Sequence, residues 1–284
     1  MAVNYERLLN WTFQDEVQAY DERDTILYAL GVGCGAEPED LKFVYERGLC
    51  ALPSMATVLS YPGFWLRNEA FGIDWTKVVH GEQLITQHAP LPLKGTAVSK
   101  SRVVDVVDKG PQSGLFVYCE RLLYEAVTET LLATLEETLI LRGDGRQRSP
   151  RQRTGRKITV PDRAPDAVIN LPTLPQAALI YRLCGDLNPL HVDPEAAAKA
   201  GFPKPILHGL CTMGLATRAV LRACCHNDPA RLRSIGARFN APVFPGETIE
   251  TQLWREDGGN ITFRCGVSER KVVVLEGAAL VVKT

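Results

Sequence analysis

The feature that most constrains the fold is a partial repeat of the first half of the chain in the second half. The stretch YALGVG at 28–33 resembles YRLCGD at 181–186, an offset of 153 residues. Two more pairs follow in the same order: LPSMATVL (52–59) with LCTMGLAT (210–217), and HAPLPLKGT (88–96) with NAPVFPGET (240–248). Matches that keep their order at a nearly constant offset indicate a duplicated structural unit.

Each half ends in runs rich in β-branched residues, which predict antiparallel strands. The expected strands are AVSKSRVVDVVDK, GLFVYCERLLY and ETLLATLEETLIL in the first half, and TIETQLWRE, NITFRCGVSE and KVVVLEGAALVV in the second. One apolar helical segment precedes each group of strands, most clearly HGLCTMGLATRAVLRACC at 208–225, whose Ala and Leu content suits a buried helix. The chain is therefore predicted to be an α+β protein in which a long sheet wraps around one central helix, twice over.

The composition changes at the midpoint of the chain. Residues 142–157, RGDGRQRSPRQRTGRK, carry seven basic residues, one acid and no large apolar side chain. Such a segment predicts a solvated linker, and a polyanion-binding arm is the alternative. The expected division is an N-terminal repeat at 1–141, a basic linker at 142–160 and a C-terminal repeat at 161–284.

The overall composition excludes several classes of partner. A hydrophobic content of 45% is typical of a globular protein, and 32 basic against 33 acidic residues leave no global field for nucleic acid or an anionic membrane. No apolar run approaches the roughly 20 residues of a membrane span. The eight cysteines form no CxxC pair and no zinc spacing with the five histidines, so we expect them to be reduced and expect no metal.

The stretch GDLNPLHVD at 185–193 gathers an acid, an amide and an imidazole around a proline. Pro189 marks a turn, so Asp186, Asn188 and His191 are expected to project from a loop before a short helix that begins near Asp193. An acid and a histidine aimed at one point can hold a water and move its proton. The alternative is structural: Asx turns, a helix cap and a core histidine.

A second stretch, PILHGLCTMG, places Gly209 at the start of the long helix. Its amide is one of the first-turn donors that the helix leaves unsatisfied, and it can receive a carbonyl oxygen that develops negative charge. The alternative is a glycine needed only for helix packing.

At these residues the chain resembles the hydratase 2 group of MaoC-like dehydratases, the (R)-specific 2-enoyl-CoA hydratases. The resemblance is carried by YRLCGDLNPLHVDPEAAAKAGFPKPILHGLCTMG and extends to YALGVG, DLKFVYE, VVHGEQ, PLPLKG, VVDVVDKG, PDRAPDAV and ARFNAPVFPGET. It differs from the expected pattern at Cys184, where we expect Ser. The resemblance implies a double hot-dog fold and syn addition of water to a trans-2-enoyl-CoA, which gives a (3R)-3-hydroxyacyl-CoA. It also implies that no metal or redox cofactor takes part.

The resemblance further implies roles for individual residues. Asp186 and His191 would hold the water and move its proton, Asn188 would orient it, and the Gly209 amide would stabilise the thioester oxyanion. Acyl-CoA contacts are implied for His80, Gly81, Lys109, Leu187, Pro189, Leu190 and Phe239. Glu46 and Tyr181 also match family positions, although a surface ion pair and a core tyrosine explain these two residues equally well. For Phe239, packing in the hydrophobic core is the alternative interpretation.

The first half lacks these catalytic residues. The offset places Gly33, Gly35 and Pro38 opposite Asp186, Asn188 and His191. We therefore expect the first half to accommodate the acyl chain, so that each chain has one active site. A homodimer follows from the resemblance, and a bacterial cytoplasmic location is expected because the C-terminal residues LVVKT are not a peroxisomal signal.

Three other functions were considered. GVGCGA at 31–36 lacks the full GxGxxG spacing and follows a helical segment, which argues against a nicotinamide dehydrogenase. A dehydratase that acts on acyl-carrier-protein or branched acyl thioesters would use the same residues. A non-catalytic acyl-CoA-binding protein would bind without turnover.

Overall fold

The computed structural model describes residues 3–146, 149, 153 and 158–282. Its centre is one antiparallel sheet in the order β1-β3-β4-β5-β2-β7-β10-β9-β8-β6. The strands are β1 (Glu16–Tyr20), β2 (Val78–Gln87), β3 (Gly95–Asp108), β4 (Leu115–Glu125), β5 (Leu131–Leu141), β6 (Ala167–Pro172), β7 (Leu232–Phe239), β8 (Thr248–Arg255), β9 (Asn260–Val267) and β10 (Val272–Val281).

The strand order shows the duplication directly. The first five strands in the sheet, β1-β3-β4-β5-β2, have the same arrangement as the last five read from the other edge, β6-β8-β9-β10-β7. The two halves meet where β2 pairs antiparallel with β7, with Ile85 opposite Ile235. Tyr28 and Tyr181, which the 153-residue offset aligns, pack with ring centroids 6.0 Å apart. This arrangement is the double hot-dog fold expected from the resemblance.

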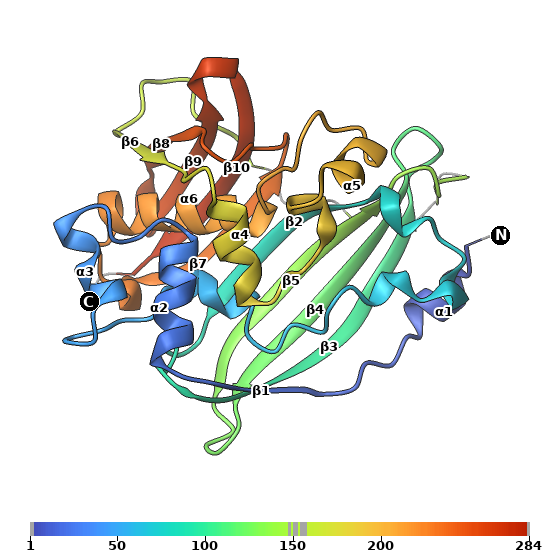
Figure 1. Ribbon diagram of the computed structural model, residues 1–284, viewed down its shortest axis with the longest axis horizontal. Helices are drawn as coiled ribbons and strands as arrows, with labels where there is room; N and C mark the ends of the chain where they lie inside the picture. Colours follow the sequence, from blue (N-terminus) through green and yellow to red (C-terminus); the bar gives the residue numbers. More distant parts are fainter. Residues whose placement is uncertain (1–2, 147–148, 150–152, 154–157, 283–284) are drawn as a thin grey trace.

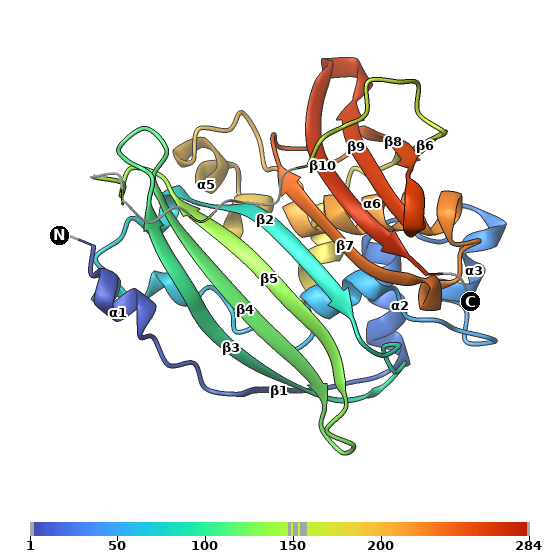
Figure 2. The same ribbon diagram turned by 180° about the vertical axis from the view of Figure 1, so that it is seen from behind.

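The helices lie on one face of this sheet (Figure 1). Seen from behind, the strands lie in front of the helices (Figure 2). The α-helices are α1 (Tyr5–Leu9), α2 (Glu22–Gly31), α3 (Leu41–Val44), α4 (Ala177–Tyr181), α5 (Pro194–Lys199) and α6 (Gly209–Cys224). Short 3₁₀ turns connect them, among them η1 (Pro38–Asp40), η2 (Pro53–Thr57), η6 (Arg182–Cys184) and η7 (Pro189–His191). None of the helices in the described residues has the length and apolar character needed to cross a membrane.

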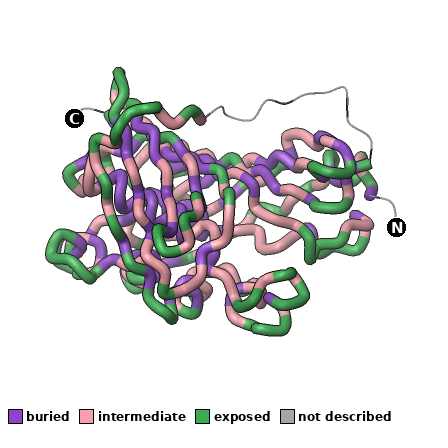
Figure 3. The backbone as a smooth tube through the Cα atoms, turned by 90° about the horizontal axis from the view of Figure 1, so that it is seen from above, coloured by how far each residue is buried: buried purple, intermediate pink, exposed green. Residues whose placement is uncertain are grey.

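The central helix α6 confirms the helix expected at 208–225. Every residue from Cys211 to Leu221 is buried, because the sheet covers one side of the helix and the segments of the first half cover the other. Gly214 permits this close approach, since a Cβ atom there would overlap the side chain of Val32. Figure 3 shows the buried residues gathered in the interior and the exposed ones mainly along the outer loops.

The expectation of a matching central helix in the first half was wrong. The segment at 52–59 forms only the short turn η2, after which Ser60 adopts a positive φ of 48°. The guanidinium of Arg121, on β4, donates to the carbonyl oxygens of Ala56, Thr57 and Leu59. In a longer helix these carbonyls would accept from amides four residues further along, but Pro62 closes off that continuation.

The predicted linker at 142–160 lies partly outside the described residues, which omit 147–148, 150–152 and 154–157. Its described residues contact the first half. The amides of Arg146 and Ser149 donate to Asp108, and the guanidinium of Arg153 lies 4.9 Å from the ring centroid of Tyr118. The domain boundaries stay a prediction. All eight cysteines are free, as expected.

A buried ion pair joins α6 to the first half. Arg218 donates to the carboxylate of Asp40 at 2.8 Å and to the carbonyl oxygen of Val32 at 2.9 Å. Each side chain of the pair is 6% exposed, so solvent cannot replace either partner. The Gly35 amide also donates to Asp40, which completes the contacts of this carboxylate.

Replacing one partner of this pair should destabilise the protein strongly. Arg218→Met leaves the Asp40 carboxylate buried without its cation, which costs about 3–5 kcal/mol of unfolding free energy. The double variant R218M/D40N should recover much of that loss, because it removes both charges. Denaturant titrations measure the differences.

Arg222→Met is the matched control, because Arg222 lies one turn further along α6 and pairs with the exposed Glu39 at 3.4 Å. Its cost should stay within about 1 kcal/mol. Equal losses for R218M and R222M would contradict the assignment of the buried pair as the anchor of α6.

Candidate active site

The loop at 185–193 is built from the turns that its sequence predicts. Gly185, at a φ of 127°, ends the helical segment α4–η6 in a conformation that favours glycine. The Asp186 side chain then accepts from the Asn188 amide at 3.1 Å, and the Asn188 side chain accepts from the Leu190 amide at 3.2 Å. Asp193 caps α5. The structural role considered for these residues is therefore present, and it does not exclude a chemical one.

His191 is buried and has a defined tautomer. Its Nδ1 lies 2.9 Å from the carbonyl oxygen of Ile206, and because a carbonyl only accepts, Nδ1 carries the hydrogen. Nε2 then has a free lone pair. Burial lowers the pKa of His191 below its ordinary value, although the Asp186 carboxylate and the bond to Ile206 oppose that shift. The imidazole is thus neutral near pH 7 and can accept a proton.

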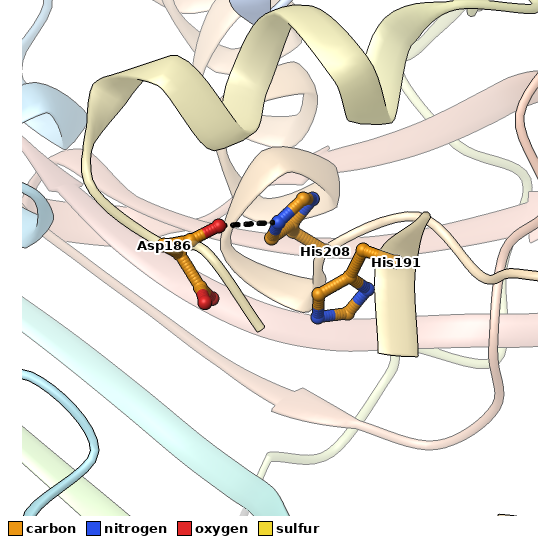
Figure 4. A group of neighbouring side chains, drawn as sticks. All are labelled: Asp186, His191 and His208. Atoms are coloured by element: carbon orange, nitrogen blue, oxygen red, sulfur yellow. Dashed lines mark hydrogen bonds between the residues drawn. The ribbon is translucent and has the colours of Figure 1, made fainter. Parts of the chain in front are cut away.

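His208, which the sequence analysis did not single out, packs directly on His191. The two rings are stacked, with centroids 3.7 Å apart and planes inclined by 27°. His208 Nε2 lies 3.1 Å from the main-chain oxygen of Asp186 and donates to it. Figure 4 shows this bond and shows the side chains of Asp186 and His191 directed to the same side of the site. Its position immediately before Gly209 is a sequence signal that places His208 at the candidate site.

The helix α6 begins at Gly209, with His208 as its N-cap residue. No side chain caps this end, and among the described residues no acceptor faces the Gly209 amide. The amide therefore stays available to an oxygen of a ligand, at the positive end of a 16-residue helix. The ring of Phe239 packs against Gly209, and its Cε1 would lie 3.1 Å from a Cβ atom there.

The first half contributes one side of the site through β2. His80 packs on Phe239 with ring centroids 4.9 Å apart, and its Nε2 donates to the carbonyl oxygen of Glu82. Between His80 and Glu82, Gly81 forms a β-bulge, and a Cβ atom on Gly81 would lie 2.7 Å from the side chain of Ile140. The ring of Phe239 thus contacts both His80 and Gly209, and the substrate-binding roles implied for these residues stay predictions.

Comparison with known proteins covers both halves. The family model described as MFE-2 hydratase 2 N-terminal domain matches residues 18–143, and the MaoC like domain matches residues 156–278. The chain is 40% identical to 3-hydroxyacyl-thioester dehydratase Y of Mycobacterium tuberculosis, over 98% of this chain and 95% of that protein. It is 37% identical to the peroxisomal enoyl-CoA hydratase 2 of Arabidopsis thaliana, over 96% of this chain and 94% of that protein. The chain belongs to the hydratase 2 family of MaoC-like dehydratases.

A solved structure supports the same family. The crystal structure of a MaoC-like dehydratase from Phytophthora capsici has a TM-score of 0.87 and 33% sequence identity to this hydratase 2 chain. The match covers 99% of this chain and 100% of that one.

Not all residues implied by the family resemblance lie together. Tyr181 is fully buried and packs on His208, with ring centroids 4.9 Å apart. The ammonium of Lys109 lies 3.8 Å from the ring centroid of Phe116, and among the described residues it has no contact with the loop at 185–193 or with Gly209. Glu46 is exposed in the segment after α3. Leu187 is 60% exposed, and Pro189 and Leu190 are partly buried beside it.

One side-chain nitrogen or carboxylate oxygen from each of Asp186, His191 and His208 lies within 4.8 Å of the other two, a spacing that also suits a metal ion. Two of the four imidazole nitrogens already donate to carbonyl oxygens. The rings are stacked, so their in-plane lone pairs run side by side instead of converging on one point, whereas metal ligands surround the ion. The geometry therefore suits proton transfer better than metal ligation.

A small cavity lies on the helical face of the sheet in the first half. It has a volume of about 20 Å³, which is room for roughly one water, and its lining includes Trp65, Gln83, Arg121 and Glu137. Glu137 Oε2 lies 3.9 Å from Nε2 of His80. A cavity of this size does not hold an acyl chain without movement of its lining, and the acyl role of the first half stays a prediction.

Lowering the pH from 7 to 5 should destabilise the protein through His208. Burial lowers the pKa of His208 to about 3, and His191 beside it acts in the same direction, against Asp186. In the unfolded chain the pKa of His208 is near its ordinary value of 6.5, so this histidine binds a proton there at pH values at which it stays neutral in the folded chain. The free energy of unfolding therefore falls as the pH drops below 6.5. At pH 5 this difference amounts to about 2 kcal/mol. Denaturant titrations at both pH values of the wild type and of H208F measure it.

The variant H208F should lose about 2 kcal/mol less than the wild type between the two pH values, because it lacks the titrating group. Other groups contribute equally to both proteins. Identical losses would show that His208 is not held neutral in the folded chain.

Gly209→Ala should destabilise the protein by crowding Phe239. The added methyl group would lie 3.1–3.2 Å from two atoms of that ring, and overpacking of this kind costs about 1–3 kcal/mol. In the background of F239L, where the smaller side chain yields space, the same substitution should cost less. A double-mutant cycle by denaturant titration gives the coupling, and a coupling of zero would contradict the contact.

Proposed function

We infer that the protein is an (R)-specific enoyl-CoA hydratase, which reversibly adds water syn to a trans-2-enoyl-CoA and gives a (3R)-3-hydroxyacyl-CoA. The observation that carries this inference is the meeting of three groups at one loop–helix junction. These groups are the Asp186 carboxylate, the free Nε2 of His191 and the unpaired amide of Gly209. The membership of the hydratase 2 family supports the same reaction.

The water would lie between Asp186 and His191. The neutral His191 accepts a hydrogen bond from the water at Nε2, and the Asp186 carboxylate accepts another. As the water oxygen bonds to C3, one of its O–H bonds breaks and the Asp186–His191 pair takes up that proton. The same pair delivers a proton to C2 on the same face, which makes the addition syn. Asn188 would orient the water, although its Oδ1 already accepts from the Leu190 amide.

The amide of Gly209 would act on the other end of the reacting system. When the oxygen attacks C3, the electrons of the C2–C3 double bond move toward the thioester carbonyl, whose oxygen gains negative charge. A fixed amide at a helix N-terminus stabilises that charge without reorganisation. Protonation at C2 then restores the carbonyl. Water addition is redox-neutral overall, so it needs no redox cofactor, and the Gly209 amide stabilises the charge that a metal ion would otherwise stabilise. We propose that neither takes part.

The acyl-CoA would contact residues from both halves of the chain. His80, Gly81 and Phe239 would line the path of the CoA ester beside Gly209, together with the loop residues Leu187, Pro189 and Leu190. Lys109 is a point charge for a CoA phosphate. A homodimer and a cytoplasmic location complete the proposal, and gel filtration and cell fractionation test these two points.

The test of the reaction uses trans-2-decenoyl-CoA as substrate, with loss of the conjugated-enoyl absorbance as the signal. Chiral analysis of the product should give the (3R) isomer. Asp186→Asn keeps the shape of the side chain but loses the base, so kcat should fall by about 10²–10⁴-fold.

Asp193→Asn is the matched control, because Asp193 lies in the same loop but caps α5. Its kcat should stay within a few-fold of the wild type. A (3S) product would contradict the stereochemistry. If only acyl-carrier-protein thioesters were turned over, the substrate would be the carrier-protein thioester and not the CoA thioester. Acyl-CoA binding without any turnover would indicate a non-catalytic binding protein.

A further inference from the structure

One short segment touches every group of the proposed reaction. Between Ile206 and Gly209, the carbonyl oxygen of Ile206 accepts from His191, the ring of His208 donates to Asp186, and Gly209 supplies the amide. The proton-transfer pair and the oxyanion donor are therefore positioned by consecutive residues of one chain segment.

His208 is the polar side chain of this segment, and the proposed proton transfer does not use it. It is 1% exposed, and its buried Nδ1 has no hydrogen-bond partner in the part of the chain that the structure describes. An unsatisfied buried nitrogen costs free energy, and an apolar ring of the same shape would avoid that cost. A purely structural requirement for a flat side chain does not explain the choice of histidine.

The polar contact that His208 does make is specific. Its Nε2–H donates to the main-chain oxygen of Asp186, 22 residues earlier in the chain, and so fixes the backbone from which the carboxylate projects. Its ring face lies 3.7 Å from that of His191, and Tyr181 packs on it at 4.9 Å. Figure 4 shows His208 beside both of the other side chains, with its dashed bond to Asp186.

We propose that His208 is a positioning residue of the hydratase reaction: its Nε2–H holds the Asp186 backbone while its ring holds the imidazole of His191. The inference rests on the proposed function. His208 touches no reacting atom. It sets the distance between the water-holding pair and the Gly209 amide, and a misplacement of about 1 Å in such an arrangement lowers the rate by roughly 100-fold.

Two substitutions separate the hydrogen bond from the ring. His208→Phe keeps a flat ring for the stack but has no donor, and it also removes the unsatisfied Nδ1. The variant should have a stability close to that of the wild type at pH 7, because the loss of the unsatisfied Nδ1 offsets the loss of the donor to the Asp186 carbonyl oxygen. Its kcat should nevertheless fall by about 10- to 100-fold, with KM changed by less than about 3-fold. A residue needed only for packing would not give a stable protein with a selective loss of kcat.

His208→Gln and His208→Asn form the matched pair for the donor. The Gln amide nitrogen reaches the place of Nε2, whereas that of Asn reaches only the place of Nδ1. Both lose the ring, so any difference between them reports the hydrogen bond. H208Q should have a higher kcat than H208N, by about 10-fold. This comparison keeps the proposal testable if H208F does not fold.

Thr217→Val is the control for loss of a buried polar group in α6, because Thr217 is fully buried and its hydroxyl bonds within the helix to Met213. Its kcat should equal that of the wild type. With an active wild type, an unimpaired H208F or equal rates for H208Q and H208N would overturn the role of His208 alone. A wild type without turnover on any enoyl thioester would overturn the proposed function and this role with it.

Discussion

The position of α6 depends on the buried ion pair between Arg218 and Asp40. The site lies at the N-terminus of that helix, so a shift of the helix along its axis would move Gly209 away from Asp186 and His191. Arg218 prevents such a shift by binding both the Asp40 carboxylate and the Val32 carbonyl oxygen. Because both charges are buried, the pair resists exchange with solvent, and the close contact at Gly214 leaves the helix little lateral freedom.

The repeat explains where this anchor comes from. The 153-residue offset aligns Asp40 with Asp193, so the first-half segment that ends in η1 is the counterpart of the catalytic loop. In the second half this segment presents Asp186 and His191 to the start of α6. In the first half, the same segment instead binds Arg218, in the third turn of the helix. Two copies of one loop therefore contact α6. The first-half copy binds Arg218 and positions the helix, and the second-half copy, at 185–193, carries the proposed chemistry at the start of the helix.

Much of this arrangement was predictable because local chemistry decides it. The Ala and Leu content of 208–225 gave the central helix, and the proline with its flanking Asp and Asn gave the loop turns. Strands β2 and β7 were not predicted as strands, since VVHGEQ and ARF were read only as motifs and their place at the centre of the sheet is a long-range property. The missing first-half helix was only partly predictable. Pro62 is a local stop signal, but Arg121, which binds the carbonyl oxygens of this segment, comes from a strand more than 60 residues later. His208 stands beside Gly209 in the sequence, but its contact with Asp186 could not be predicted because the two residues are 22 positions apart in the chain. The roles of the site residues themselves stay predictions.

The union of the two repeats in one chain has a consequence for how such a protein can change. In an assembly of two identical subunits, every substitution appears twice, so a change that widens one half also deforms the catalytic half. Here β2 and β7, which an approximate two-fold rotation relates, are encoded by separate parts of one chain, so a substitution in one strand leaves the other unchanged. The first half could thus exchange its long helix for the turn η2 and its polar loop for Gly33, Gly35 and Pro38, while selection on the second half continued undisturbed.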